Sequence, residues 1–227
     1  MKSWFFTATD TGVGKTTVTA ASASALRTRG VNVGIMKPFA TGAERKHGYR
    51  SEDVALLAEA AGIQDPEAMI NPFFFAIESS PYGAANRLGF DIDMGLALRQ
   101  FEILQSLHDT VLVEGIGGVL TPILKNYFVA DLIRDMGLDT VIVASSKLGT
   151  VNHTLLTCDA CKRRGIAVRG LVIIGAERGY DLEELGQDLE NLSGIEVLCT
   201  LPFMKNLDLP KASGVVAESK LFDLISS

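Results

Sequence analysis

Short runs of residues that are apolar on both faces alternate with longer helical patterns along this chain. VLV, VIVA and LVII are examples of such runs. Strands buried on both faces are typical of parallel sheets, and successive parallel strands need a crossover connection, usually a helix. The alternation therefore predicts an α/β fold, a doubly wound and mostly parallel sheet flanked by helices.

The bounds of the elements follow from these runs and from the glycines that commonly end the helical patterns. We expect strands at 4–8, 31–36, 110–113, 140–144, 168–174 and 196–201. We expect helices at 15–29, 51–61, 93–107, 130–136, 152–164, 182–192 and 213–225. The stretch 69–90 is aromatic and rich in turn residues, and it predicts only a strand or loop followed by a short helix near 82–88.

Composition excludes several classes of protein. Of 227 residues, 47% are apolar and 21% are charged, which excludes a disordered chain. A net charge of −6 argues against nucleic-acid binding, which needs clustered basic residues. Neither a membrane span nor a signal peptide is predicted, so we expect a cytoplasmic protein with no membrane partner. No linker divides the sequence, and we expect one domain over residues 1–227.

A glycine-rich segment, ATDTGVGKTT at 8–17, follows the first predicted strand and opens a helix. It matches the phosphate loop G-x-x-x-x-G-K-[ST] except at the first glycine, where Thr9 stands. Backbone amides from Gly12 to Thr16 and the start of the helix would hold phosphates. Lys15 would reach the terminal phosphates and Thr16 would bind Mg²⁺.

Charged residues also follow two other predicted strands. Lys37 comes after the second strand, and Glu114 comes directly before a loop with three glycines. The carboxyl ends of parallel strands share one edge of the sheet, so Lys37 would lie near Lys15, and Glu114 could contact Mg²⁺. Asp53, near the start of a predicted helix, is the other candidate ligand of Mg²⁺.

Two further patterns carry weaker signals. The segment KLGTVNHT at 147–154 follows another strand, and Asn152 is expected to cap the helix there. Cys158 and Cys161 form C-x-x-C in the middle of a predicted helix. A zinc site lacks further ligands and a redox motif belongs at a strand-to-helix turn, so we expect a buried structural role.

Four motifs in order resemble those of the dethiobiotin synthetases: T-D-T-x-V-G-K-T, K-P-x-x-[ST]-G, V-E-G-x-G-G and K-L-G-x-x-N-H. The resemblance covers residues 6–157. It implies a homodimeric ligase of biotin biosynthesis that depends on ATP and Mg²⁺. Such enzymes join CO₂ to 7,8-diaminononanoate through a carbamate and a carbamic-phosphoric anhydride, which closes a ureido ring and releases ADP and phosphate.

The resemblance also assigns roles to residues. Lys37 and Lys15 would be catalytic, and Thr16, Asp53 and Glu114 would bind Mg²⁺. The expected nucleotide contacts are Gly12, Val13, Gly14, Lys15, Thr16, Thr17, Asp53, Glu114, Gly117, Pro202, Phe203 and Met204. The expected substrate contacts are Thr11, Thr41, Pro81, Gly118, Lys147, Leu148 and Asn152, the last three near the dimer interface.

The chain departs from the family pattern at Ile174-Gly175, where an Asn-Asp pair often recognises adenine. We therefore expect weak selection of the base, with CTP or GTP partly replacing ATP. The main alternative is a switch ATPase of the partitioning or septum-placement type. Those proteins carry a lysine four residues before the last glycine of the loop, where this chain has Asp10. A cobyrinate-amidating enzyme would need a glutaminase domain, for which the chain has no room.

Overall fold

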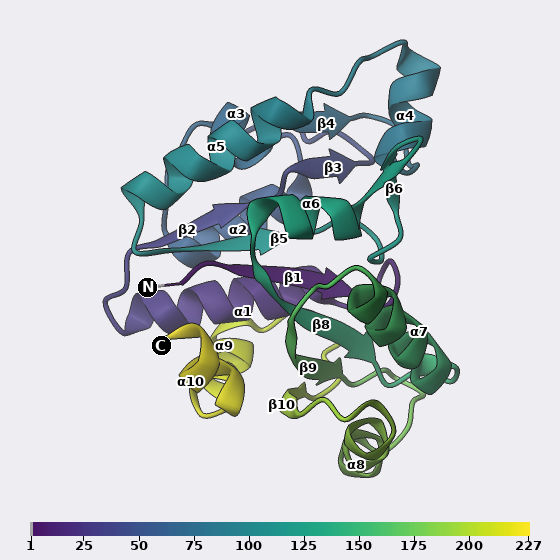
Figure 1. The fold of residues 1–227 in the computed structure, drawn as a ribbon. Helices are drawn as coiled ribbons and strands as arrows, with labels where there is room; N and C mark the ends of the chain where they lie inside the picture. The colour runs from purple at the N-terminus through teal and green to yellow at the C-terminus, as the bar shows by residue number, and fades with distance from the viewer. Residues whose placement is uncertain (1) are drawn as a thin grey trace.

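A six-stranded parallel sheet forms the centre of the computed structural model, which describes residues 2–227 (Figure 1). The strands lie in the order β10-β9-β8-β1-β5-β2, and every neighbouring pair is parallel. Their bounds are β1 Trp4–Ala8, β2 Val33–Met36, β5 Thr110–Glu114, β8 Asp139–Ser145, β9 Val168–Ile174 and β10 Val197–Leu201. The prediction of a parallel α/β sheet is confirmed.

Helices cover both faces of this sheet, and each strand sends alternate side chains into the two resulting cores. On β1, Trp4 and Phe6 lie in one core and Phe5 in the other. One layer consists of α1 Lys15–Thr28, α2 Glu52–Ala61, α9 Leu209–Ala217 and α10 Lys220–Ile225. The opposite layer consists of α5 Met94–Leu107, α6 Val129–Met136, α7 Thr150–Arg163 and α8 Leu182–Ser193. Two buried faces explain why the strand sequences are apolar throughout.

Two predicted helices differ from those in the structure. The single helix expected at 213–225 is two helices, α9 and α10, because Ser219 between them is extended, with φ −110° and ψ 161°. The expected cap at Asn152 is also wrong. Gly149, with φ 93°, is the N-cap of α7, so the helix begins at Thr150 and Asn152 is its third residue.

Several short elements lie outside the central sheet. Strands β3 (Phe39–Thr41) and β4 (Phe73–Phe75) form a parallel pair, and β6 (Pro122–Leu124) and β7 (Tyr127–Phe128) form an antiparallel pair. Short helices α3 (Glu67–Ile70) and α4 (Pro81–Leu88) flank β4. The aromatic stretch therefore contains a strand and then a short helix, as predicted, whereas β3 and the β6–β7 pair were not predicted.

The position of β1 fixes where a ligand would bind. The chain leaves β1 for β2 on one side of it, and later adds β8 on the other side. Open α/β sheets bind ligands beyond the carboxyl ends of their strands at such a switch point. Among the helices of residues 2–227, none has both the length and the apolar character needed to cross a membrane.

Candidate active site

The loop between β1 and α1 presents backbone amides at the carboxyl edge of the sheet. Gly12 and Gly14 have φ of 70° and 96°, a left-handed conformation that glycine adopts without strain. Gly14 is the N-cap of α1 and has no side chain with which to cap the helix. The first amides of α1 are therefore available to bind an anion such as a phosphate.

Two buried lysines lie beside this loop, and their partners differ. Lys37 Nζ lies 2.5 Å from Glu114 Oε1 and 2.7 Å from Asp53 Oδ2. Lys15 Nζ instead donates a hydrogen bond of 3.4 Å to Gly117 O. Burial lowers the pKa of Lys15. Burial acts in the same direction on Lys37, but the charges of Glu114 and Asp53 outweigh it and raise the pKa of Lys37.

The two oxygens of Glu114, a wholly buried residue at the end of β5, have different surroundings. Oε1 contacts Lys37 and accepts a hydrogen bond of 2.9 Å from Thr16 Oγ1, whereas Oε2 has no hydrogen-bond partner. Asp53 is the second residue of α2. Burial raises the pKa of Asp53, but Lys37 outweighs this effect and lowers it, so Asp53 is ionised at neutral pH.

These oxygens fit a hydrated Mg²⁺ ion. An unpartnered buried carboxylate oxygen, a second carboxylate and a hydroxyl are hard donors of the kind that Mg²⁺ prefers. Within residues 2–227, no cluster of three or more His, Cys, Asp and Glu side chains could hold a metal by itself. Mg²⁺ does not need such a cluster, because it usually keeps water and takes phosphate oxygens as ligands.

Clefts on both sides of the loop meet at the two lysines. The largest, about 700 Å³, has Thr11, Thr41, Asp53 and Gly117 in its lining. The cleft on the other side, about 360 Å³, is lined in part by Gly12, Val13, Gly14, Thr17, Lys147, Ile174, Gly175, Pro202, Phe203 and Met204. A third, about 340 Å³, contains Lys15, Thr16 and Lys37 and shares residues with both. The structure thus brings the predicted phosphate, metal and base-binding residues together.

Five predicted substrate residues do not line the cleft that contains Thr11 and Thr41. Gly118 lines a separate cleft of about 400 Å³, which also contains Asp10 and His153. Pro81 is the first residue of α4 and is buried. Leu148 is 85% exposed, and Asn152 is exposed on α7.

Lys147 lies in the smaller cleft beside the loop instead of in the largest one. Lys147 and Asp10 line different clefts. Asp10 Oδ1 accepts a hydrogen bond of 2.7 Å from Thr11 N.

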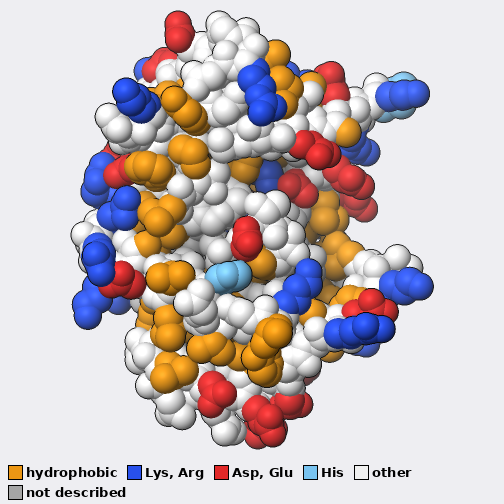
Figure 2. Space-filling view, turned by 90° about the vertical axis from the view of Figure 1, so that its right-hand side faces the viewer, with side chains coloured by type: hydrophobic (Ala, Val, Ile, Leu, Met, Phe, Trp, Pro, Cys, Tyr) orange, Lys and Arg blue, Asp and Glu red, His pale blue; other side chains and the backbone are white. Residues whose placement is uncertain are grey.

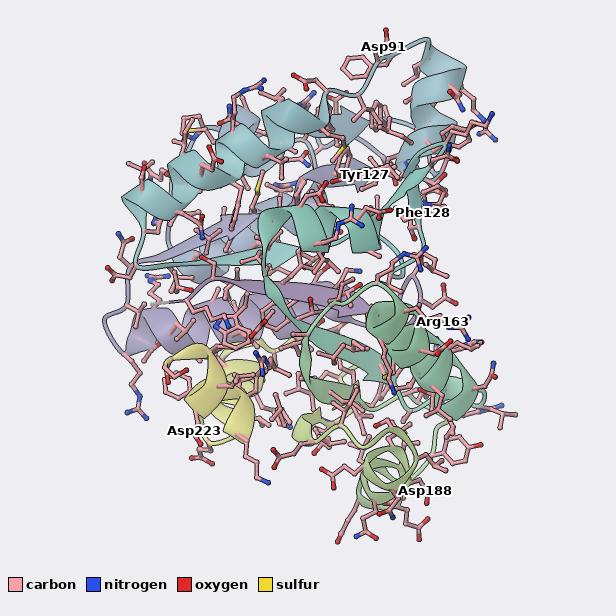
Figure 3. All side chains as sticks on the ribbon, viewed as in Figure 1. Asp91, Tyr127, Phe128, Arg163, Asp188 and Asp223 are labelled. Atoms are coloured by element: carbon pink, nitrogen blue, oxygen red, sulfur yellow. The ribbon has the colours of Figure 1, made fainter. Side chains whose placement is uncertain are left out.

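The surface around the site has two features that bear on partners. Figure 2, which faces the side of α4 and α7, shows hydrophobic side chains gathered in a broken band. Figure 3 shows Asp91, Asp188 and Asp223 on the outside of the molecule, in the connection before α5 and on α8 and α10. None of these three acidic side chains lines the clefts around Lys15 and Lys37.

The cysteine pair lies in the middle of α7, as predicted. Cys161 is buried and Cys158 is half-buried. Burial raises the pKa of Cys158 to about 11 and that of Cys161 to about 12. Thiols with such pKa values are inert near neutral pH, which suits the expected structural role.

Two contacts that shape the site were not predicted, one made by Asn71 and one by Ile174. Asn71 is wholly buried, and its Nδ2 donates hydrogen bonds to Lys37 O at 2.6 Å and to Phe73 O at 3.3 Å. Ile174 packs under the loop, since a Cβ on Gly14 would lie 2.4 Å from Ile174 Cδ1. A polar residue within an aromatic run was a signal for Asn71, whereas a strand-end isoleucine carries none.

Comparisons with known proteins agree with this geometry. A family model described as an AAA domain matches residues 2–211. The ATP-dependent dethiobiotin synthetase of Nitrosopumilus maritimus is 48% identical over 208 residues, which cover 91% of each chain. The protein of the same name from Bacillus velezensis is 38% identical over 204 residues, 90% of this chain and 85% of that one.

Among solved structures, the MinC:MinD cell division protein complex of Aquifex aeolicus aligns with a TM-score of 0.62. The alignment covers 100% of this chain and 96% of that one at 13% identity, so it supports the P-loop fold alone. The switch-ATPase alternative therefore has a likeness of fold, whereas the dethiobiotin synthetases also match along the sequence. The chain belongs to the dethiobiotin synthetase family, whose members are ATP-dependent ligases.

Proposed function

We propose that this protein makes dethiobiotin from 7,8-diaminononanoate and CO₂, with ATP as the phosphoryl donor. The observation that carries the proposal is Lys37, which lies between Asp53 and Glu114 where the clefts meet. A carbamate and a triphosphate are both anions, so their reaction needs fixed positive charge between them. Lys15 and Lys37 provide that charge in a buried setting.

The two lysines would perform different parts of the reaction. Lys15, which has no carboxylate in contact, would bind the terminal phosphates of ATP. Lys37 would stabilise the γ-phosphoryl group as a carbamate oxygen attacks its phosphorus. Thr16, Asp53 and Glu114 would hold Mg²⁺, which supplies neutralisation of the phosphate charge.

The remaining steps form the ring. Attack on the γ-phosphorus gives a carbamic-phosphoric anhydride and ADP. The second amine of the substrate then attacks the carbonyl carbon, and phosphate leaves as the ureido ring closes. Both reacting groups belong to one molecule, and holding them in line can contribute about 7–11 kcal/mol. We place this molecule in the largest cleft, against Thr11 and Thr41. Pro81 and Gly118 would lie at its margins, because they directly follow the lining residues Ser80 and Gly117.

A second copy of the chain would complete the substrate site. Leu120, Leu148 and Leu156 are exposed large hydrophobic residues. Leu120 lies in the loop after β5, Leu148 just before α7, and Leu156 on α7. α7 lies on the face that Figure 2 shows, and the exposed apolar side chains gathered there favour association. We propose a cytoplasmic homodimer of single-domain subunits, in which Lys147 and Asn152 receive the carboxylate tail of the substrate across the interface.

The base of the nucleotide would lie in the smaller cleft beside Ile174 and Gly175. Ile174 offers no hydrogen bond to a base. A Cβ on Gly175 would lie 2.6 Å from Phe203 N, so this backbone leaves no room for a side chain there. Base contacts would come from the backbone of 202–204, and we expect CTP and GTP to support part of the activity of ATP. Strict adenine preference in a competition assay would contradict this.

Mass detection of dethiobiotin tests the function. Purified protein is given diaminononanoate, bicarbonate and MgATP, beside Lys37→Ala and a control, Lys220→Ala, which removes an exposed lysine paired with Glu196. We expect product and ADP in equal amounts from the wild type and from the control, and almost none from Lys37→Ala. Phosphate release without dethiobiotin would reject the ligase and favour a switch ATPase.

A further inference from the structure

The segment before β4 contains a buried amide that touches the backbone of Lys37. Asn71 is 0% exposed and ends α3, where its own N–H donates to Glu67 O at 2.7 Å. Its side-chain Nδ2 donates to Lys37 O and Phe73 O. A buried amide with both hydrogens used in this way is costly to replace, because two carbonyls would lose their partner.

A proline explains why a side chain makes the bond to Lys37 O. Phe39 of β3 lies opposite Phe73 of β4, and each follows a proline, Pro38 and Pro72. Proline has no backbone N–H and cannot donate in a strand ladder. The Lys37 N–H donates to Ile70 O, so the parallel ladder would bring the N–H of residue 72 to Lys37 O, and Pro72 has none. Asn71 Nδ2 supplies this missing donor and also donates to Phe73 O.

The peptide of Lys37 is consequently held from both sides by one short segment. Its N–H donates to Ile70 O at 2.9 Å, and its carbonyl accepts from Asn71 at 2.6 Å. The two partners are neighbours at the end of α3. Lys37 lies between a strand and a proline, and these two bonds fix the backbone from which its side chain projects.

The other end of α3 reaches the helix of Asp53. Glu67 accepts a hydrogen bond of 2.7 Å from Arg50 N, and its second oxygen lies 3.3 Å from Arg50 Nε. Arg50 directly precedes Ser51, the N-cap of α2, whose second residue is Asp53. One short helix therefore connects the backbone of Lys37 with the start of the helix that carries its partner carboxylate.

We propose that Asn71 is a positioning residue for the ligase reaction, which sets the place of the Lys37 ammonium by holding the Lys37 carbonyl. This inference rests on the proposed function of Lys37. Asn71 acts through the backbone, so its loss should slow the chemical step while leaving nucleotide binding by the glycine-rich loop unchanged. A displacement of about 1 Å at a reacting group can cost about 100-fold in rate.

The test compares Asn71→Leu and Asn71→Asp, which keep the approximate volume of the side chain but lose its donors, with a matched control. Thr110→Val also removes a buried side-chain donor to a backbone carbonyl, the bond of 2.8 Å from Thr110 Oγ1 to Lys2 O at the opposite edge of the sheet. We expect kcat for dethiobiotin to fall about 10- to 100-fold in the Asn71 variants, with KM for MgATP within about twofold. Thr110→Val should keep both values.

Amide hydrogen exchange at Lys37 gives a readout that does not depend on activity. The Lys37 N–H should exchange faster in the Asn71 variants than in the wild type or in Thr110→Val. Each protein is measured at the same number of degrees below its own Tm. If the Leu and Asp variants do not fold, Asn71→Ser, which keeps one donor, is judged by the same criteria.

Two results would overturn the proposal: a kcat no lower than that of Thr110→Val, or unchanged exchange at Lys37. A wild type that makes no dethiobiotin would refute the ligase instead. The exchange measurement would still decide whether Asn71 holds Lys37.

Discussion

The two lysines of the site belong to regions built in different ways. On the loop side, residues 12–17 present backbone amides, and Lys15 Nζ contacts the carbonyl of Gly117. On the ion-paired side, Lys37 contacts Asp53 and Glu114 before any ligand arrives. The comparison teaches that the lysine at the proposed phosphate site has no carboxylate in contact, whereas two carboxylates hold the ammonium of Lys37 in place.

The largest expected effect is on the ion-paired side. Lys37→Met leaves Glu114 buried without its cation, and removal of one partner from a buried ion pair costs about 3–5 kcal/mol. Urea unfolding of the ligand-free protein measures this loss, and dethiobiotin formation should fall about 100- to 1000-fold or more. Lys220→Met removes an exposed pair and should change stability little. If Lys37→Met and Lys220→Met are equally stable, the ion pairs of Lys37 do not stabilise the fold, and the difference between the two regions is refuted.

A smaller loss is expected on the loop side. Gly14→Ala forces a side chain into a left-handed conformation and against Ile174 Cδ1, and we expect about 2–3 kcal/mol of destabilisation with weaker MgATP binding. Gly30→Ala is the matched control, since Gly30 has φ 82° and open space around its Cβ position. Ile174→Val removes the clashing Cδ1 and should recover part of the loss. No recovery would show that backbone strain alone is responsible.

Lys15→Met should behave in the opposite sense to Lys37→Met. A buried ammonium without a carboxylate in contact opposes folding, so the ligand-free variant should be as stable as the wild type or more stable by up to about 1 kcal/mol. Product formation should nevertheless fall at least about 100-fold. Thermal unfolding without nucleotide distinguishes the two lysines. A clear loss of stability in Lys15→Met would show that other groups compensate the charge of Lys15 in the ligand-free protein.

The smallest effect is a difference in alkaline pH dependence. The pKa of Lys15 is lowered in the folded protein, so the unfolded chain binds more protons and stability rises with pH up to about 10.4. The pKa of Lys37 is raised, so its contribution is present below about 10.4 and is lost as pH rises through the folded value. A plot of the free energy of unfolding against pH, measured between pH 8 and 10, should be flatter for Lys15→Met than for the wild type. Thr110→Val should keep the slope of the wild type.

The sequence predicts the local parts of the site better than the contacts between residues that are distant along the chain. The glycine-rich loop is a local motif, and Lys37 and Glu114 were found because they follow buried strands at one edge. Asn71 and Ile174 act across 34 and 160 residues of chain, on Lys37 and Gly14, and periodicity carries no information about such contacts.

Strand pairing and assembly set the other limits. Each strand of the β3–β4 pair has three residues, too few to show an alternating pattern, and the pair depends on contacts between distant segments. The expected roles of Lys147, Leu148 and Asn152 involve a second copy of the chain, so no single-chain argument could place them with Thr11 and Thr41.

The packing of Ile174 against Gly14 limits how this protein could be redesigned. An engineer who wants a different nucleotide preference would first change the wall of the smaller cleft at position 174. That substitution would also remove the support beneath the phosphate-binding backbone. In the proposed nucleotide site, base recognition and phosphate recognition would therefore depend on the same side chain. A library that varies position 174 should be screened for affinity toward inorganic triphosphate as well as for base choice.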